Sequence, residues 1–288
     1  MNNGSYFIPR DRIHPFLNPA AMNNEEGLYI SWETDPAVAR RVLPPVLDLI
    51  DPDHPVAMVY VVNIREPTFA PWYMEGGIYL LCRYKETPGV YFLNLQLSGP
   101  GAAMGLCSGR EFSGLPKKLC ERIVVERNDR WARTFIESKG RRIFDAQVEI
   151  GASDETASEG PDQGVGPGET SRASVFLFQY ETDRASDGHM TFPKMSLINY
   201  DSITEYKSWE PARIVSLAME PSLDDPWAEL VVVKPVAAAY SINSNWVPNV
   251  SRIAEFEGEQ ADSLMSYLFS GRWDRSTICD GHQRYGQL

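Results

Sequence analysis

The chain has 288 residues, of which 43% are hydrophobic and 23% are charged, the balance of a globular protein with a large core. Its 39 acidic and 27 basic residues give a net charge of −12. That charge opposes binding to nucleic acids or anionic membranes, because phosphate binding needs clustered lysine and arginine. No apolar run approaches the roughly 20 residues that span a bilayer, and no signal peptide is evident. We therefore predict a cytoplasmic protein with neither a nucleic-acid nor a membrane partner.

The first part of the chain predicts an arm, a strand and a short helix. Residues 1–27 are polar and contain prolines, which indicates an N-terminal arm. Residues 28–32 predict a strand. Asp35-Pro36 then predicts the start of a helix, because aspartate caps helices and proline is favoured at the first helical position. We expect this helix to end at Pro44-Pro45.

The pattern from residue 55 to residue 240 is that of β-strands. Apolar, β-branched and aromatic segments alternate with clusters of Gly, Pro, Asn or charged residues. The predicted strands are 55–64, 74–84, 90–97, 119–126, 131–138, 142–150, 173–180, 197–206, 214–219 and 230–240. Turns are expected at Asn128-Asp129 and Lys139-Gly140. Many strands, short turns and few helices predict a mainly β fold, a closed or nearly closed antiparallel barrel.

One polar segment interrupts the strands. Residues 151–172 are rich in Gly, Ser, Glu, Asp and Pro, and such a segment cannot bury enough apolar surface to fix itself. We predict a mobile surface loop there, inside a single domain of residues 28–271. A helix is expected from about Glu257, and residues 272–288 are expected to form a tail.

A lysine pair is the main candidate for chemistry. It stands in Gly109-Arg110-Glu111, then four residues, then Pro116-Lys117-Lys118. Adjacent ammonium groups repel, and an ammonium group kept from water loses its proton more readily. A neutral lysine amine attacks ketones to form an imine, which on protonation withdraws electrons from a neighbouring C–C bond. Only one of two adjacent side chains can point straight into a pocket, on a helix or on a strand.

This motif resembles the lysine motif of the acetoacetate decarboxylase family, which is itself the known example of a lysine activated by a neighbouring cation. Two further segments, Trp72-Tyr73-Met74-Glu75-Gly76-Gly77 and Glu33-Thr34-Asp35-Pro36, are similar to family segments. The resemblance implies a β-barrel flanked by further strands, with the lysine inside a funnel-like cavity. It implies that Lys117 forms the Schiff base, that Lys118 favours its neutral amine, and that Glu75 is the acid–base carboxylate.

The resemblance also has departures and open positions. Glu25 falls where the family has an active-site arginine, and Tyr60 falls where it has a second glutamate. A phenol at 60 supplies a proton donor in place of an acceptor. The candidate substrate-binding residues are Tyr60, Tyr73, Tyr240, Arg110 and Glu111; the tyrosines are alternatively packing residues, and the last two alternatively a pair that holds the lysine loop.

The sequence predicts no metal site and no cofactor. Its four cysteines show no C-x-x-C spacing, and it has no glycine-rich phosphate loop or dinucleotide-binding motif. By the resemblance, the lysine itself is the electron sink. The implied function is decarboxylation of a small-molecule β-keto acid. The alternatives are an aldolase-dehydratase that joins a keto acid such as pyruvate to an aldehyde, and a non-catalytic ligand-binding protein. The family also implies a homo-oligomer.

Overall fold

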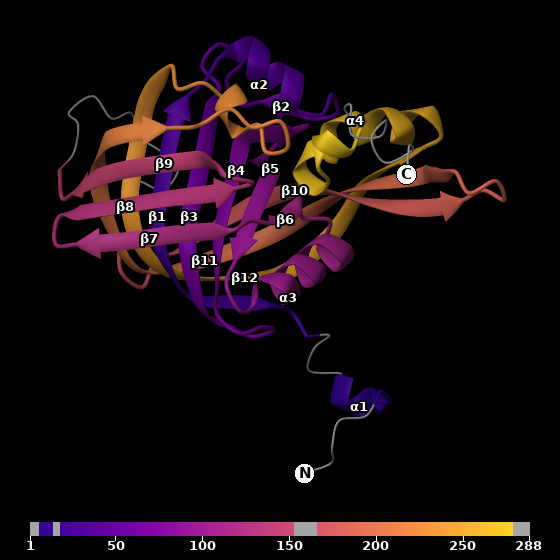
Figure 1. The fold of residues 1–288 in the computed structure, drawn as a ribbon, viewed down its shortest axis with the longest axis horizontal. Helices are drawn as coiled ribbons and strands as arrows, with labels where there is room; N and C mark the ends of the chain where they lie inside the picture. The colour runs from indigo at the N-terminus through magenta and orange to yellow at the C-terminus, as the bar shows by residue number, and fades with distance from the viewer. Residues whose placement is uncertain (1–5, 14–17, 153–165, 279–288) are drawn as a thin grey trace.

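The computed structural model describes residues 6–13, 18–152 and 166–278. Its centre is a closed ring of strands in the order β10–β5–β4–β3–β1–β12–β11, closed because β11 also pairs with β10 (Figure 1). The neighbours in this ring are antiparallel, except that β10 and β5 are parallel. The sheet continues from β11 through β9 and β8 to β7. The predicted mainly β fold, a ring of strands with a flanking sheet, is therefore confirmed.

The elements have the following bounds. The ring consists of β1 (Ala21–Glu33), β3 (Val56–Pro67), β4 (Tyr73–Tyr84), β5 (Thr87–Ser98), β10 (Thr170–Arg184), β11 (Met190–Ala218) and β12 (Lys234–Glu257). The flanking strands are β7 (Arg122–Asn128), β8 (Trp131–Ser138) and β9 (Arg141–Ile150), and two short strands, β2 (Asp48–Leu49) and β6 (Lys117–Leu119), pair with β4 and β5. The α-helices are α1 (Arg10–Ile13), α2 (Pro36–Val42), α3 (Ala102–Cys107) and α4 (Glu259–Arg272). A π-helical turn, η2 (Ser108–Phe112), continues α3, and η3 (Trp227–Glu229) and η4 (Arg275–Thr277) are 3-10 turns.

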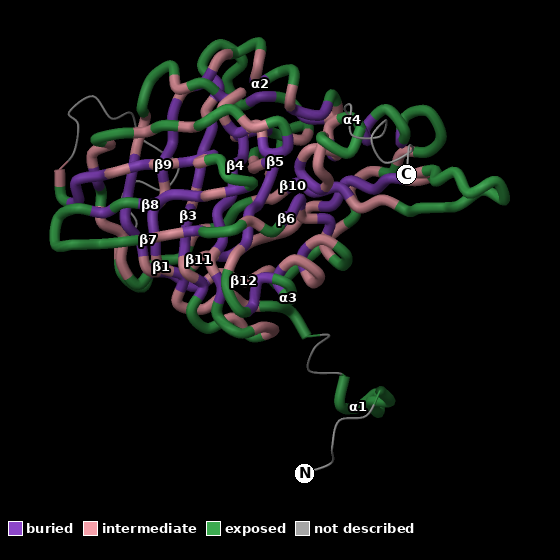
Figure 2. The backbone as a smooth tube through the Cα atoms, in the orientation of Figure 1, coloured by how far each residue is buried: buried purple, intermediate pink, exposed green. Residues whose placement is uncertain are grey.

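The main core packs one face of the ring strands against the flanking sheet and the helices. Successive residues of a strand face opposite sides, so Leu28 and Ile30 of β1 join this core together with Ile136 and Phe144 of the flanking sheet. Figure 2 shows the buried residues concentrated along these strands. A second, smaller cluster, which includes Val62, Tyr73 and Leu95, packs apart from the main one, near the cavity described below.

The predicted local signals at α2 and at the flanking hairpins are confirmed. The Asp35 carboxylate accepts a hydrogen bond from the Val38 backbone N–H at 2.9 Å, and α2 ends one residue before Leu43 and its following prolines. Asp129 and Lys139 adopt positive φ angles of 54° and 51°, which suits tight turns. The strand between them, β8, has the predicted bounds.

Several boundaries differ from the prediction. The arm is shorter, because β1 already begins at Ala21 and pairs there with β12 and, from the next residue, with β3. Two predicted strands, 197–206 and 214–219, are one bulged strand, β11, whose polar middle is paired on β12. The tail begins later, since Trp273 packs on Tyr180 and Phe192. Most of the predicted mobile loop, residues 153–165, lies outside the described residues, and β10 begins at Thr170 within its predicted range.

Candidate active site

Strand β6 directs Lys117 and Lys118 to opposite sides. This short strand pairs in parallel with β5, Leu95 being opposite Lys117, and adjacent residues of a strand alternate in direction. The Lys117 ammonium nitrogen Nζ lies 2.7 Å from Oε2 of Glu75 on β4. The two residues are only 5% and 6% exposed, so the ion pair lies inside the protein.

The turn that precedes β6 leaves room for the Lys117 side chain only because it carries a glycine. An added Cβ at Gly109, in η2, would lie 2.6 Å from Cδ of Lys117, well inside van der Waals contact. The position of the Lys117 side chain thus explains why the first residue of the lysine motif is a glycine.

Glu75 is held by a second donor. The Tyr60 hydroxyl donates a hydrogen bond of 2.6 Å to Oε1 of Glu75, and the ring of Tyr73 lies 5.9 Å from Nζ of Lys117. Burial, together with the charge of Glu75, raises the pKa of Tyr60 well above 10. Tyr60 is therefore a permanent phenol donor to the carboxylate. Lys117, Glu75 and Tyr60 form one hydrogen-bonded chain.

Glu25 of β1 completes the buried ionisable groups near Lys117. It is 8% exposed and lines the same cavity as Lys117 and Glu75. Burial, and secondarily the charge of Glu75, raises the pKa of Glu25 from 4.5 to about 8, although Lys117 acts in the opposite direction. At neutral pH Glu25 is therefore a carboxylic acid, while its neighbour Glu75 accepts two hydrogen bonds.

The interior of the ring is a large cavity of about 1390 Å³ to which all seven ring strands contribute lining residues. Much of its wall is apolar or aromatic, and includes Phe69, Tyr79, Phe92, Leu115, Val175 and Val250. Its charged lining residues, among those described, are Glu25, Glu75, Lys117, Arg172 and Asp201. Arg172 has a side chain 67% exposed and pairs with Asp201 at 3.5 Å, so it stands at the rim.

Lys118 has its charge balanced on the other side of β6. Its Nζ lies 2.6 Å from Oδ1 of Asp225 and 2.8 Å from Oδ1 of Asp274, and donates to the Asp224 carbonyl oxygen at 2.9 Å. Asp225 is fully buried and also accepts hydrogen bonds from Gln96 and Ser138. Two carboxylates offset the repulsion that the sequence predicted Lys118 to exert on Lys117. The geometry gives Lys118 a structural anchor that ties β6 to the segments after β11 and α4.

Of the five candidate substrate-binding residues, only Tyr60 lines the cavity, which corrects the sequence prediction. Tyr73 packs in the second cluster beside it, and the other three lie away from it. Tyr240 faces the other way on β12 and donates to Oε1 of Glu26 at 2.6 Å. Arg110 donates to the Arg272 carbonyl oxygen at 3.2 Å, and Glu111 is exposed with no ion pair among the described residues. Both residues belong to the π-helical turn η2, in which Gly109 is the buried residue.

The sequence shows Glu25 where the family has an active-site arginine, but it indicates no role for this glutamate. Its neighbour Tyr29, whose hydroxyl accepts a hydrogen bond of 2.8 Å from Nδ2 of Asn243, was not considered at all. Glu25, Gly27 and Tyr29 alternate with the buried residues Leu28 and Ile30. That period of two was the available signal for a second strand face.

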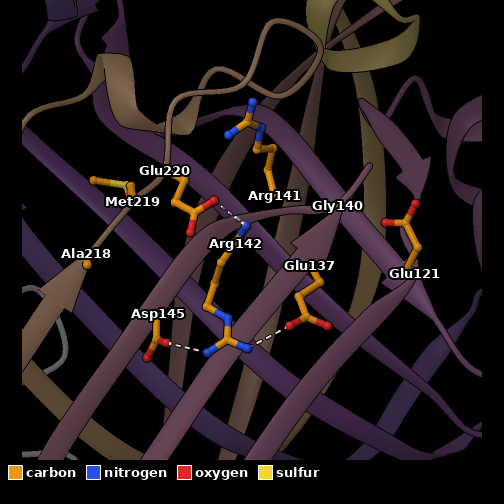
Figure 3. A pocket seen from close by; sticks show the side chains of 9 residues that line it. All are labelled: Glu121, Glu137, Gly140, Arg141, Arg142, Asp145, Ala218, Met219 and Glu220. Atoms are coloured by element: carbon orange, nitrogen blue, oxygen red, sulfur yellow. Dashed lines mark hydrogen bonds and ion pairs between the residues drawn. The ribbon is translucent and has the colours of Figure 1, made fainter.

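A second depression, of about 700 Å³, lies where the flanking hairpins meet the end of β11 (Figure 3). Arg142 forms ion pairs with Glu137 at 2.7 Å and with Asp145 at 3.0 Å. Its backbone N–H donates a hydrogen bond to Oε2 of Glu220. None of its lining residues lines the ring cavity. Neighbouring carboxylates thus balance the charge of Arg142, and the depression lies beside the turn that the sequence predicted at Lys139-Gly140.

Within the described residues, no cluster of His, Cys, Asp and Glu could hold a metal ion. The described cysteines are free, and burial raises the pKa of Cys120 to about 12. No helix in the described parts of the chain is long and apolar enough to cross a membrane.

Comparison with known proteins identifies the family of the chain. The family model for acetoacetate decarboxylase matches residues 7–253. The chain belongs to the acetoacetate decarboxylase family. The chain is also 32% identical over 274 residues to the CLA biosynthesis isomerase of Lactiplantibacillus plantarum, an alignment that covers 94% of this chain and 95% of that protein.

Solved structures of the acetoacetate decarboxylase type share the fold. Acetoacetate decarboxylase from Legionella pneumophila superposes with a TM-score of 0.68 at 21% identity, over 83% of this chain and 88% of that one. The enduracididine biosynthesis enzyme MppR, complexed with the condensation product of pyruvate and imidazole 4-carboxaldehyde, has a TM-score of 0.60 at 15% identity, over 82% and 89% of the two chains. The predicted resemblance is confirmed, and it supports an enzyme of this family.

Proposed function

We propose that this protein is a Schiff-base enzyme that moves a double bond within an unsaturated ketone bearing an apolar chain. The observation that carries this proposal is the ion pair of Lys117 with Glu75, beside the unpaired carboxyl group of Glu25, inside a large cavity whose wall is largely apolar. Isomerisation of this kind needs an amine to form the imine and groups that take and return protons. Unlike decarboxylation, it releases no carbon dioxide.

The reaction follows from the contacts of Lys117. Its amine attacks the ketone carbon, water leaves, and a protonated imine forms. This iminium acidifies the C–H bond beside it, and Glu75, released from its ion pair, takes that proton. The electron pair of that C–H bond forms a new C=C bond to the former imine carbon, the C=N π pair moves onto nitrogen, and a dienamine results. Protonation at the far end of the dienamine yields the conjugated iminium, and hydrolysis releases the conjugated ketone and regenerates Lys117.

The charges of the cavity support proton transfer over decarboxylation. A β-keto acid would bring its carboxylate close to the iminium, where the described cavity wall offers the carboxylate of Glu75, and where the only other cation of that wall, Arg172, is paired at the rim. A ketone without a carboxylate at that position meets no such repulsion. The name of the relative that is 32% identical to this chain, an isomerase, agrees with this choice.

Decarboxylation of a β-keto acid is the second candidate, and the match to the acetoacetate decarboxylase family model favours it. The aldolase-dehydratase alternative would start from the same iminium and capture an aldehyde instead. All three reactions share Lys117 as nucleophile and differ in what leaves or joins the enamine. A non-catalytic binding protein would form no imine.

The test is borohydride trapping with three probes: allyl heptyl ketone, acetoacetate, and pyruvate with an aliphatic aldehyde. We expect allyl heptyl ketone to leave a reduced adduct on Lys117, located by peptide mass spectrometry, and to turn into the conjugated ketone, followed by its ultraviolet absorbance. Lys117→Met should abolish both. If acetoacetate releases carbon dioxide and no conjugated ketone forms from allyl heptyl ketone, the protein is a decarboxylase and the isomerase proposal is wrong. A condensation product of pyruvate and the aldehyde would favour the aldolase.

A further inference from the structure

A β-bulge lies directly before Glu25 on β1. The pairing of β1 with β12 shifts register between Met22 and Glu25, and Asn24 within this bulge has a positive φ of 53°. Bulges re-aim side chains and are frequent beside active sites. Without the irregularity at Asn24, the backbone on the N-terminal side of Glu25 would keep the ladder that the rest of β1 shows. From Glu25 to Tyr29 β1 alternates regularly, so Glu25 lies on the same strand face as Tyr29, which also lines the cavity.

Glu25 and Glu75 approach the same space from different strands. Through β3, Glu25 is level with Ile64 and Tyr73, whereas Glu75 is level with Val62 and Gly27. The two carboxyl groups therefore start two strand spacings apart, about 10 Å, and reach the cavity from opposite sides of Tyr60 and Val62. They address different points of a ligand attached to Lys117.

The side chain of Glu25 is also uncommitted. Among the described residues it has neither an ion pair nor a side-chain hydrogen bond, although it is more than nine-tenths buried. The ionisable groups whose charges it interacts with come from its own strand, from β3, from β4 and from β6, and they are Tyr29, Tyr60, Tyr73, Glu75 and Lys117. A buried, unpaired carboxyl group that lines a cavity is costly to keep unless it has a task.

We propose that Glu25 is a second catalytic acid, which protonates the far carbon of the substrate after Glu75 has deprotonated the near one. This proposal rests on the proposed function. It assigns separate tasks to two carboxyl groups in different surroundings: Glu75, which accepts hydrogen bonds from Lys117 and Tyr60, is the base, and the buried, unpaired Glu25 is the acid. The departure from the family pattern at position 25 then marks a change of reaction, from loss of a carboxylate to relocation of a proton.

The proton balance closes over one turnover. Glu75 takes the proton from the carbon between the iminium and the alkene, and the electron pair forms the dienamine. The Glu25 O–H bond breaks as its proton joins the far carbon of the dienamine, the other π pair becomes the conjugated C=C bond, and the nitrogen lone pair re-forms the C=N bond of the iminium. Glu75 then carries one extra proton and Glu25 lacks one. The water that hydrolyses the iminium can carry a proton from the first carboxyl group to the second, which restores the starting state.

The test uses Glu25→Gln, which keeps the shape of the protonated side chain but has no proton to give. With allyl heptyl ketone in deuterium oxide, we expect Glu25→Gln to retain the borohydride-trapped adduct on Lys117 and the deuterium exchange at the carbon beside the ketone. Formation of the conjugated ketone should fall at least 100-fold, in line with the usual contribution of general acids. Glu25→Asp should recover part of this rate.

Two controls separate the possible failures. Glu205→Gln changes an exposed glutamate of β11 and should leave all three readouts unchanged. Equal losses of exchange and conjugation in Glu25→Gln would overturn the assignment, because a merely structural role would lower both together. Conjugation at the wild-type rate would overturn it as well. No adduct in the wild-type protein would remove the proposed function and the role of Glu25 with it. If Glu25→Gln does not fold, the exchange-to-conjugation ratio of Glu25→Asp decides, an unchanged ratio being the refuting result.

Discussion

The raised pKa of Glu25 predicts how stability depends on pH, whatever reaction the site performs. The folded protein holds the Glu25 proton up to about pH 8, whereas the unfolded chain releases it near 4.5. Between these values the folded state binds more protons, so raising the pH favours unfolding. The stability that Glu25 contributes is complete below pH 4.5 and is lost as the pH rises to about 8. Glu25→Gln cannot ionise and lacks this dependence.

The magnitude follows from the two pKa values. Each pKa unit corresponds to 1.36 kcal/mol, so the wild-type protein should lose up to about 2.5 kcal/mol relative to Glu25→Gln between pH 5 and pH 7. Near pH 5 the two proteins should have similar stability, and at pH 7 the variant should be the more stable one. Glu25 is 8% exposed, so solvent screening takes little from this difference.

The assay is urea denaturation of both proteins, followed by tryptophan fluorescence at half-unit intervals from pH 5 to pH 8. The difference between the two free energies of unfolding isolates Glu25, because all other ionisable groups are common to both proteins. Glu205→Gln, an exposed change of the same type, should run parallel to the wild type. Parallel curves for Glu25→Gln and the wild type would refute the reasoning, since they would mean that Glu25 titrates alike in the folded and unfolded chains.

Three further changes test other contacts of the site. Gly109→Ala places a methyl group 2.6 Å from the Lys117 side chain and should slow adduct formation about 100-fold in the borohydride assay, whereas an unchanged rate would show that the turn yields. Tyr60→Phe removes the 2.6 Å hydrogen bond to Glu75 and should cost about 2 kcal/mol in urea denaturation; a loss below 0.5 kcal/mol, as a rough limit, would argue against that bond. Asp225→Asn removes the shortest ion pair of the buried Lys118 and should lower the free energy of unfolding by about 3 kcal/mol. Unaltered stability would contradict the anchoring role of Lys118.

The sequence predicted best those parts whose signals are local. Strand β8 has its predicted bounds because Asp129 and Lys139-Gly140 punctuate both ends with turn residues. Helix α2 was found from Asp35-Pro36, a cap and a first-turn proline. The α3–η2 segment was missed, because its run of small and apolar residues after Gly101 carries neither a helix cap nor a clear period.

In the site, the meeting of Lys117 with Glu75 was anticipated only through the family spacing. The place of Glu25 beside Lys117 could not be, since it depends on the pairing of β1 with β3 and with the distant β12, which no local pattern reveals. The same holds for Lys118, whose partners Asp225 and Asp274 lie far along the chain. Contacts of this kind are set by tertiary pairing, which outweighs the local preferences that a sequence displays.

The closure of the ring also fixes when the cavity can exist during synthesis. Strand β1 can pair with β3 early, but its other neighbour, β12, follows only at residues 234–257, and the seam between β10 and β5 is likewise late. A nascent chain that has already emerged past Lys117 therefore still exposes the open edges of β1 and β5. Open edges of this kind pair readily with other chains. The walls of the cavity are thus completed last, and a chain that ends before residue 234 would lack the closed ring and carry open strand edges that favour aggregation.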